Sequence, residues 1–275
     1  MANAPKPTTP VKKESSGTSA AFSTLVIPIA LVVAILIFMF ILGDPSHYKG
    51  GDSSSEPADI FGTVHKGGVL VPLVMSYVLM VIVFSIERFI VIGKASGTSS
   101  VDSFVRRIQG FLNVGNIDAA SAECDKQKGS VANVIKSGLT KYREMELDTT
   151  LDVDQKTLAI QKTIEEATAL EMPMLEQNLT IIATLVSIGT LTGLLGTVVG
   201  MIKAFAELSG AATNTSRLSA AISEALVNTA MGITTSALSI VMYNVFTSKI
   251  DSLTYAIDET GFSIVQTFAA SHKNK

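Results

Sequence analysis

The sequence has no Trp, a single Cys and few charged residues. Without Trp, aromatic side chains at a lipid–water boundary would have to come from Tyr and Phe. The lone Cys124 cannot form an intrachain disulfide, so cysteine usage says nothing about an oxidising compartment. Because no second Cys or His lies near it in the sequence, we interpret Cys124 as a packing residue rather than a nucleophile.

Several functional classes lack the residues they need. The formal net charge is -3, which provides no basic surface for nucleic acid. His47, His65 and His272 are scattered without ligand-like neighbours, so no metal site is predicted. There is no phosphate-binding glycine loop and no nucleophile–base arrangement, so the sequence predicts neither a cofactor nor an enzyme. Any energy source would then be an ion gradient or a partner.

Long apolar segments are abundant instead. Hydrophobic residues make up 47% of the chain, and the mean hydropathy is +0.42. A membrane-crossing helix needs about 20 apolar residues, and segments 21–42, 69–93, 179–205 and 220–247 reach that length. The first could be a secretory signal, but its apolar core is long and no small-residue cleavage pattern follows it. The sequence therefore predicts an all-α polytopic membrane protein with four transmembrane helices.

Basic residues near the span ends predict the orientation, because cytoplasmic loops carry an excess of Lys and Arg. The relevant residues are Lys6, Lys12, Lys13, Arg88, Lys94, Lys249, Lys273 and Lys275. They place both termini and region 94–178 in the cytoplasm, and loops 43–68 and 208–218 outside. Lys203 weakly opposes this pattern.

Two charged positions near span ends have simple interpretations. Lys203 is expected to be an anchor whose long side chain reaches the membrane surface. The adjacent Glu87 and Arg88, at the inner end of the second span, are expected to form an interfacial charge pair.

Outside the spans, composition divides the chain further. Segment 1–20, rich in Pro, Ser, Thr and Lys, is predicted to be a disordered tail, and 43–68 an external linker without a buried core. Region 94–178 has helical periodicity throughout, and 251–275 is predicted to be a cytoplasmic helix and tail.

Within region 94–178, Asn116 is a plausible N-cap. A long helix is expected from about Asp154, with a kink at Pro173. Apolar residues that recur at helical spacing, and so predict a helical core, are Phe104, Ile108, Phe111, Leu112, Val131, Val134, Ile135, Leu139, Tyr142, Ile160 and Ile164.

The last two spans are rich in small residues. Gly189, Gly193, Gly196 and Gly200 follow at intervals of four, three and four, which keeps them on one helical face. Such spacing favours close helix packing, and Gly232 belongs to a similar small-residue stripe in the fourth span.

Polar residues accompany these glycines. Thr190 and Thr197 are seven residues apart and share a stripe of the third span. Glu224 is the one charge at the start of an otherwise uncharged run, with Asn228 one turn later and Thr229 about 140° away around an ideal helix. A carboxylate within a span indicates an ion path or a relay, whereas one near the end of a span can simply be hydrated.

Several stretches resemble the MotA/TolQ/ExbB proton-channel family. They are 193–200 (GLLGTVVG), 222–232 (ISEALVNTAMG) and 243–246 (YNVF), with weaker matches at 115–120, Cys124, 134–139 and Glu87–Arg88. The resemblance covers roughly 69–250, which would be the channel domain, and it is specific because the glycines, threonines and acid occur together in order.

The resemblance implies an inner-membrane motor subunit. ExbB-type members form a homo-oligomeric ring, typically a pentamer, around the single-span helices of an ExbD-type partner. Proton flow drives motion that a TonB-type protein carries to outer-membrane transporters. In that family an Asp of the partner is the main proton carrier, and the residues matching the path here are Thr197, Glu224 and Thr229, with Asn228 and Thr190 as further pore-lining candidates.

Two departures from the family pattern leave alternatives open. The first is an extra N-terminal span. The second is the set of polar residues Asn228, Thr234 and Thr235, whose oxygen atoms could help dehydrate sodium, so proton and sodium coupling both stay open. A TolQ-like subunit, a stator-type subunit and a non-conducting assembly scaffold are the alternatives to an ExbB-type channel.

Overall fold

The computed structural model describes residues 16–51, 55–208 and 215–272. Some predictions fall outside these residues. They concern most of the N-terminal tail, most of the loop expected at 208–218, and the two basic residues Lys273 and Lys275. Within them the chain is helical and contains no strand, which confirms the all-α prediction. Four helical segments are long and apolar enough to cross a membrane: Phe22–Leu42, Leu70–Asn113, Val153–Leu208 and Thr215–His272. The protein is therefore a polytopic membrane protein.

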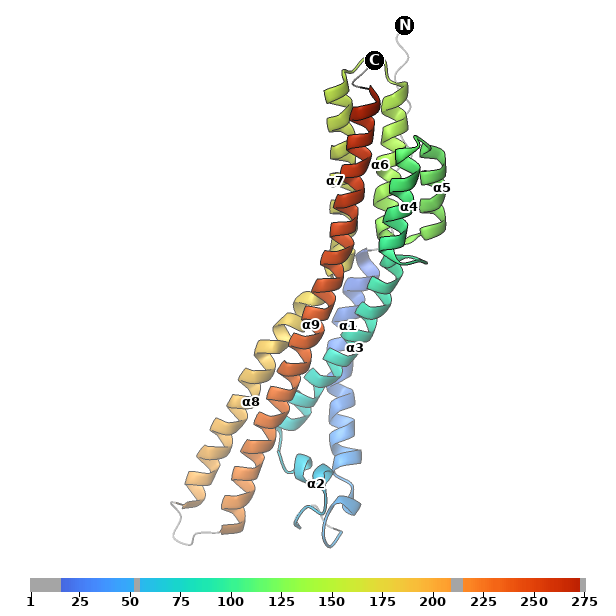
Figure 1. Ribbon diagram of the computed structural model, residues 1–275. Helices are drawn as coiled ribbons and strands as arrows, with labels where there is room; N and C mark the ends of the chain where they lie inside the picture. Colours follow the sequence, from blue (N-terminus) through green and yellow to red (C-terminus); the bar gives the residue numbers. More distant parts are fainter. Residues whose placement is uncertain (1–15, 52–54, 209–214, 273–275) are drawn as a thin grey trace.

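The molecule is elongated, with one helix running its full length (Figure 1). This helix, α9 (Thr215–His272), continues far beyond the predicted span 220–247. In one half of the molecule α9 pairs with α8 (Leu179–Leu208), and in the other half it packs against α4, α6 and α7. We call the end of the α8–α9 pair near 208 and 215 the hairpin tip.

The half that contains the α8–α9 pair, which we call the apolar half, is completed by α3, which packs against α9, and by α1, which packs against α3. Helix α1 (Ser16–Leu36) continues as a short π-helix at Ile37–Leu42 and packs along α3 (Leu70–Ser96), where Phe22 and Phe84 make an edge-to-face contact at 6.3 Å. Because α1 begins at Ser16, the end of the predicted disordered tail 1–20 is helical.

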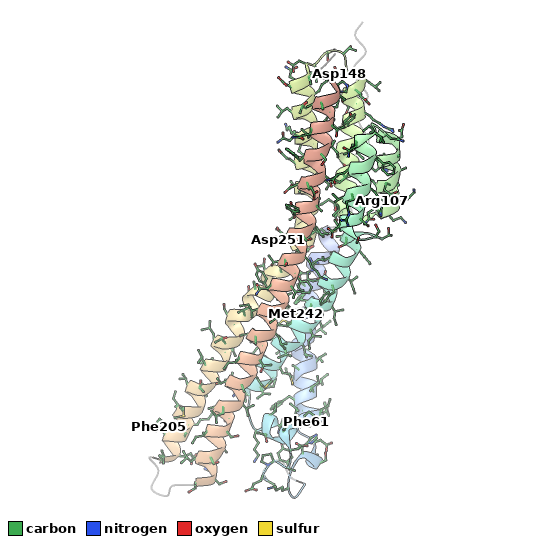
Figure 2. The ribbon with its side chains drawn as sticks, in the orientation of Figure 1. Phe61, Arg107, Asp148, Phe205, Met242 and Asp251 are labelled. Atoms are coloured by element: carbon green, nitrogen blue, oxygen red, sulfur yellow. The ribbon has the colours of Figure 1, made fainter. Side chains whose placement is uncertain are left out.

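The other half, which we call the polar half, is a bundle of four shorter helices, three of which pack against the end of α9 while α5 packs against α4 and α6. They are α4 (Val101–Asn113), α5 (Ile117–Gln127), α6 (Gly129–Leu147) and α7 (Val153–Glu176). Figure 2 places Arg107 and Asp148 in this half, and Phe205 in the opposite half near the hairpin tip.

The bundle core contains most of the residues that the periodicity singled out, although Phe111 is only partly buried, and it also includes residues of α9 such as Ile264 and Phe268. Phe104, Ile108, Val134, Ile135 and Leu139 have no exposed surface. The N-cap prediction is also confirmed, because the Asn116 side chain accepts a hydrogen bond from the Ala119 amide at 3.0 Å. Such a cap stabilises a helix by about 1 kcal/mol.

The connection from α7 to α8 differs from the prediction. Pro173 lies inside α7, and the helix continues past it to Glu176. The break comes at Gln177 and Asn178, where Asn178 adopts a left-handed conformation with φ 65°. Asn tolerates this conformation better than most residues, so the break depends on Asn178 rather than on the proline.

Loop 43–68 is folded, so the prediction of a linker without a buried core is wrong. It contains a short turn at Pro45–His47, helix α2 (Ile60–His65) and a bridge between Tyr48 and Pro57. Tyr48 is 4% exposed, and its hydroxyl lies 2.5 Å from Nδ1 of His65. Burial lowers the pKa of His65 below its ordinary value and raises that of Tyr48.

Candidate functional site in the paired α8 and α9 helices

The predicted glycines all lie in the seam between α8 and α9. Gly189, Gly193, Gly196 and Gly200 are buried on the side of α8 that faces α9, and Gly232 opposes them from α9. A methyl group added at Gly232 would meet the Gly189 carbonyl oxygen at 2.6 Å and the Gly193 Cα at 2.8 Å. Since carbon atoms pack at about 3.5–4.0 Å, the two backbones approach too closely for any side chain at this position.

Thr197 and Thr229 meet across this seam. The Thr229 hydroxyl lies 3.0 Å from the Gly193 carbonyl oxygen and 3.4 Å from the Thr197 hydroxyl. Thr197 donates to the Leu194 carbonyl of its own helix at 2.7 Å. The two threonines that the family resemblance singled out therefore form one polar contact between the helices.

A second hydroxyl contact repeats this arrangement seven residues along each helix. The Ser236 hydroxyl lies 2.6 Å from the Val186 carbonyl oxygen and 2.8 Å from the Thr190 hydroxyl. Seven residues correspond to about 10 Å of helix. Ser236 was not among the sequence-based candidates, although its spacing from Thr229 equals that of Thr190 from Thr197 and could have identified it.

Asn228 is fully buried within the chain, where it joins three elements. Its amide nitrogen donates to the Gly67 carbonyl at 2.8 Å and to the Glu224 carbonyl at 3.0 Å, while its Oδ1 atom has no partner among the described residues. The Asn228 Cβ packs against Gly196. In the single chain this side chain therefore connects α8, α9 and the turn before α3, and presents no exposed polar surface.

Glu224 is paired with Lys203, a contact that the sequence did not predict. The Lys203 Nζ atom lies 2.6 Å from Oε1 of Glu224, whose side chain is 17% exposed. The Gly68 backbone lies directly against the same carboxylate. Their positions could have suggested the pair, because Lys203 near the end of one span and Glu224 near the start of the next come together in an antiparallel hairpin.

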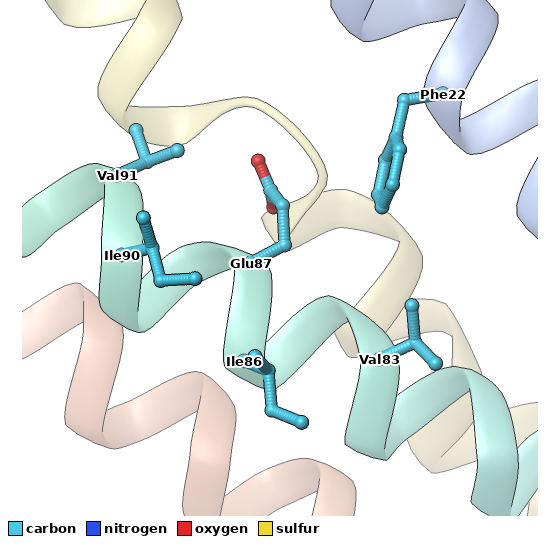
Figure 3. Close-up of a pocket in the computed structure, with 6 residues that line it drawn as sticks. All are labelled: Phe22, Val83, Ile86, Glu87, Ile90 and Val91. Carbon is cyan, nitrogen blue, oxygen red and sulfur yellow. The ribbon is translucent and has the colours of Figure 1, made fainter.

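The expected interfacial pair of Glu87 and Arg88 is a buried cluster. The Arg88 side chain is 1% exposed and donates to the carbonyl groups of Met174 and Leu175 at 3.1 Å, as well as to Glu87. Figure 3 shows the Glu87 carboxylate turned from α3 towards the connection between α7 and α8. There Asn178 donates to it at 3.3 Å. The cluster satisfies carbonyl groups at the end of α7 and fixes the helix break against α3.

The cysteine and the histidine described next have structural environments. Among the described residues no cluster of three His, Cys, Asp or Glu side chains could hold a metal ion. Cys124 is buried, and burial raises the pKa of its thiol to about 12. His47 pairs with Asp59 at 2.6 Å inside the folded loop.

Residues 126–259 match the model of the MotA/TolQ/ExbB proton channel family. The match covers just under half of the chain and supports its assignment to this family. The matched region contains α6, α7, the α8–α9 seam and the Lys203–Glu224 pair, and ends before the last turns of α9.

Two relatives are similar to the chain. A putative biopolymer transport protein, ExbB-like 3, from Synechocystis is 38% identical over 88 residues, which are 31% of this chain and 42% of the relative. The Tol-Pal system protein TolQ from Pseudomonas aeruginosa is 22% identical over 200 residues, which are 70% of this chain and 85% of the relative.

Proposed function

We propose that the chain is an inner-membrane proton-channel subunit of an ExbB–ExbD-type motor that energises TonB-dependent transport across an outer membrane. Several copies, in a ring of five by family resemblance, would surround the single-span helices of an ExbD-type partner. Both termini would lie in the cytoplasm, as the distribution of Lys and Arg favours.

One observation carries the proposal: the seam between α8 and α9 contains pairs of hydroxyl groups but no acidic side chain beside them. Residues 225–248 of α9 carry no charged side chain and correspond to about 36 Å of helix. In α8 the charged residues are Lys203 and Glu207, both close to the tip. Because the hydrocarbon core is about 30 Å thick, a proton relay through this seam needs a carboxylate from another chain.

The hydroxyl pairs support such a relay without completing it. Thr197 with Thr229, and Thr190 with Ser236, could orient water or a partner carboxylate by hydrogen bonds. The outward face of α8 is apolar, with Leu191, Leu195 and Val198 more than half exposed in the single chain. Lipid or neighbouring copies would cover this face.

Reconstitution with and without the partner tests the proposal. The complex purified with its natural partner should carry protons into liposomes along a membrane potential, whereas the chain alone should not. Glu224→Gln and Thr229→Ala should assemble normally and lose most of the flux. Equal flux with and without the partner would refute the need for a partner acid, and unimpaired transport after replacing Thr197, Glu224 and Thr229 together would favour a scaffold.

A TolQ-type role is the second candidate, because the TolQ relative aligns over 85% of its own length. The partner that co-purifies decides between the two roles. A single-span protein that couples to TonB-dependent uptake supports the ExbB-type motor. A TolR-type partner would support the TolQ-type role, and a partner with a peptidoglycan-binding domain would indicate a stator.

A further inference from the structure

The hairpin tip carries two ion pairs that cross from α8 to α9. Lys203 and Glu224 are 2.6 Å apart, and Arg217 and Glu207 are 4.0 Å apart. These four residues are the charged side chains of the two helices within the described tip segments 201–208 and 215–224. Their charges cancel, so these four side chains contribute no net charge to the tip.

The Glu224 carboxylate is enclosed rather than open. The Gly68 backbone packs against the carboxylate on one side, and the Glu224 side chain is 17% exposed. Lys203 approaches with a side chain that is 52% exposed, compared with 17% for Glu224. The ammonium group therefore occupies a position against the carboxylate that a cation would otherwise take.

We propose that Lys203 is a positioning residue that holds Glu224 in an ion pair and thereby excludes hydrated metal cations from the mouth of the ion path at the hairpin tip. The inference rests on the proposed function, because it assumes that ions pass this tip in a ring of copies. Rings of unpaired Asp or Glu side chains are the usual way in which pores attract cations. Each Lys203 removes one such carboxylate from the ring.

The ion pair also predicts how each substitution changes the net charge at the mouth. Removing Lys203 alone leaves one negative charge per copy at the mouth. Removing Glu224 alone leaves one positive charge per copy, which opposes every cation, including the proton. Removing both leaves the mouth neutral, as in the unmodified protein.

Sodium permeability tests the inference. The full-length complex is reconstituted in liposomes, and entry of radiolabelled Na⁺ and of protons is measured for each variant. Lys203→Gln should raise Na⁺ entry at least about twofold, since one unpaired charge about 8 Å from an ion in water changes its local concentration by about that factor. Lys203→Arg should behave as the unmodified protein. Lys162→Gln is a matched control, because it removes a lysine from an exposed ion pair with Glu166 on α7.

The double variant separates charge from structure. If the ion pair acts through charge, Lys203→Gln combined with Glu224→Gln should return Na⁺ entry to the unmodified level. If the pair only fastens the helices, the double variant should leak as much as Lys203→Gln, and the inference is overturned. Unchanged Na⁺ entry in Lys203→Gln also overturns it. Absence of proton flux in the unmodified complex would instead contradict the proposed function.

Discussion

Substituting Gly232 by Ala should separate α8 from α9. The new methyl group would lie 2.6 Å from the Gly189 carbonyl oxygen and 2.8 Å from the Gly193 Cα. Both neighbours are backbone atoms, so no side chain can rotate away. Relieving the contacts requires a shift of about 0.7 Å, the difference between 2.8 Å and the shortest normal carbon–carbon contact of about 3.5 Å.

The expected cost follows from two opposing effects. Overpacking a well-packed interior costs about 1–3 kcal/mol, and the upper part of that range applies because the obstacles are main-chain atoms. Ala stabilises a helix by about 1 kcal/mol relative to Gly. The net destabilisation is therefore about 2 kcal/mol, equivalent to a fall in Tm of about 4–8 °C for a domain of this size.

Far-ultraviolet circular dichroism of the detergent-purified protein measures this change, since the chain has no Trp for fluorescence. Gly93→Ala on α3 is the matched control, because a methyl group there meets nothing within 4 Å. It should leave Tm unchanged or raise it slightly. If Gly232→Ala melts at the same temperature as Gly93→Ala, the close approach of the two backbones is not what stabilises the seam.

Three other predictions concern buried and titrating groups. Arg88→Met should cost about 2–4 kcal/mol, because it removes the arginine partner of Glu87 and leaves two carbonyl groups at the end of α7 unpaired; thermal melting should show a much smaller loss for Arg107→Met, because the Arg107 side chain is 41% exposed and Glu123 keeps Lys126 as a partner. Because burial lowers the pKa of His65, the folded loop resists protonation, so its stability is present above the ordinary pKa of 6.5 and falls as the pH drops below it. The protection factors for hydrogen exchange in 43–51 and 55–68, which correct the exchange rates for the intrinsic slowing of exchange at lower pH, should therefore fall from pH 7.5 to 5.5. His65→Phe should abolish that dependence. Cys124, buried with a thiol pKa of about 12, should resist maleimide at neutral pH until the protein is denatured; labelling of the folded protein at the rate of a free thiol would contradict its burial.

Local sequence patterns were sufficient to predict features that depend on residues within a single helix. The spacing of Phe104, Ile108 and Leu112 predicts the buried stripe of α4, because residues three and four apart share a face. The Asn116 cap follows from the same local logic, since a cap bonds only to amides within its own first turn.

Contacts between distant segments were not predicted, because the periodicity of a segment does not show which other segment it will contact. Lys203 and Glu224 each looked like an end-of-span charge, and only their antiparallel pairing brings them within 2.6 Å. The break at Asn178 was attributed to Pro173, whose ring a helix can accommodate where neighbouring groups satisfy the freed carbonyls. Loop 43–68 was read as a linker because His and Tyr in a polar sequence give no sign of the contact that buries Tyr48.

The two connections between the apolar and polar halves differ in stiffness. Helix α9 crosses from one half to the other without interruption for 58 residues, about 87 Å. The path through α7 and α8 is broken at Asn178 and held there by Arg88, which bonds the end of α7 to α3. A displacement of the hairpin along its axis is therefore transmitted to the bundle through α9, because a continuous helix cannot shorten without breaking its own hydrogen bonds. The other path has no such continuity, because its helical hydrogen bonds stop at the break, where Arg88 satisfies the exposed carbonyl groups of α7.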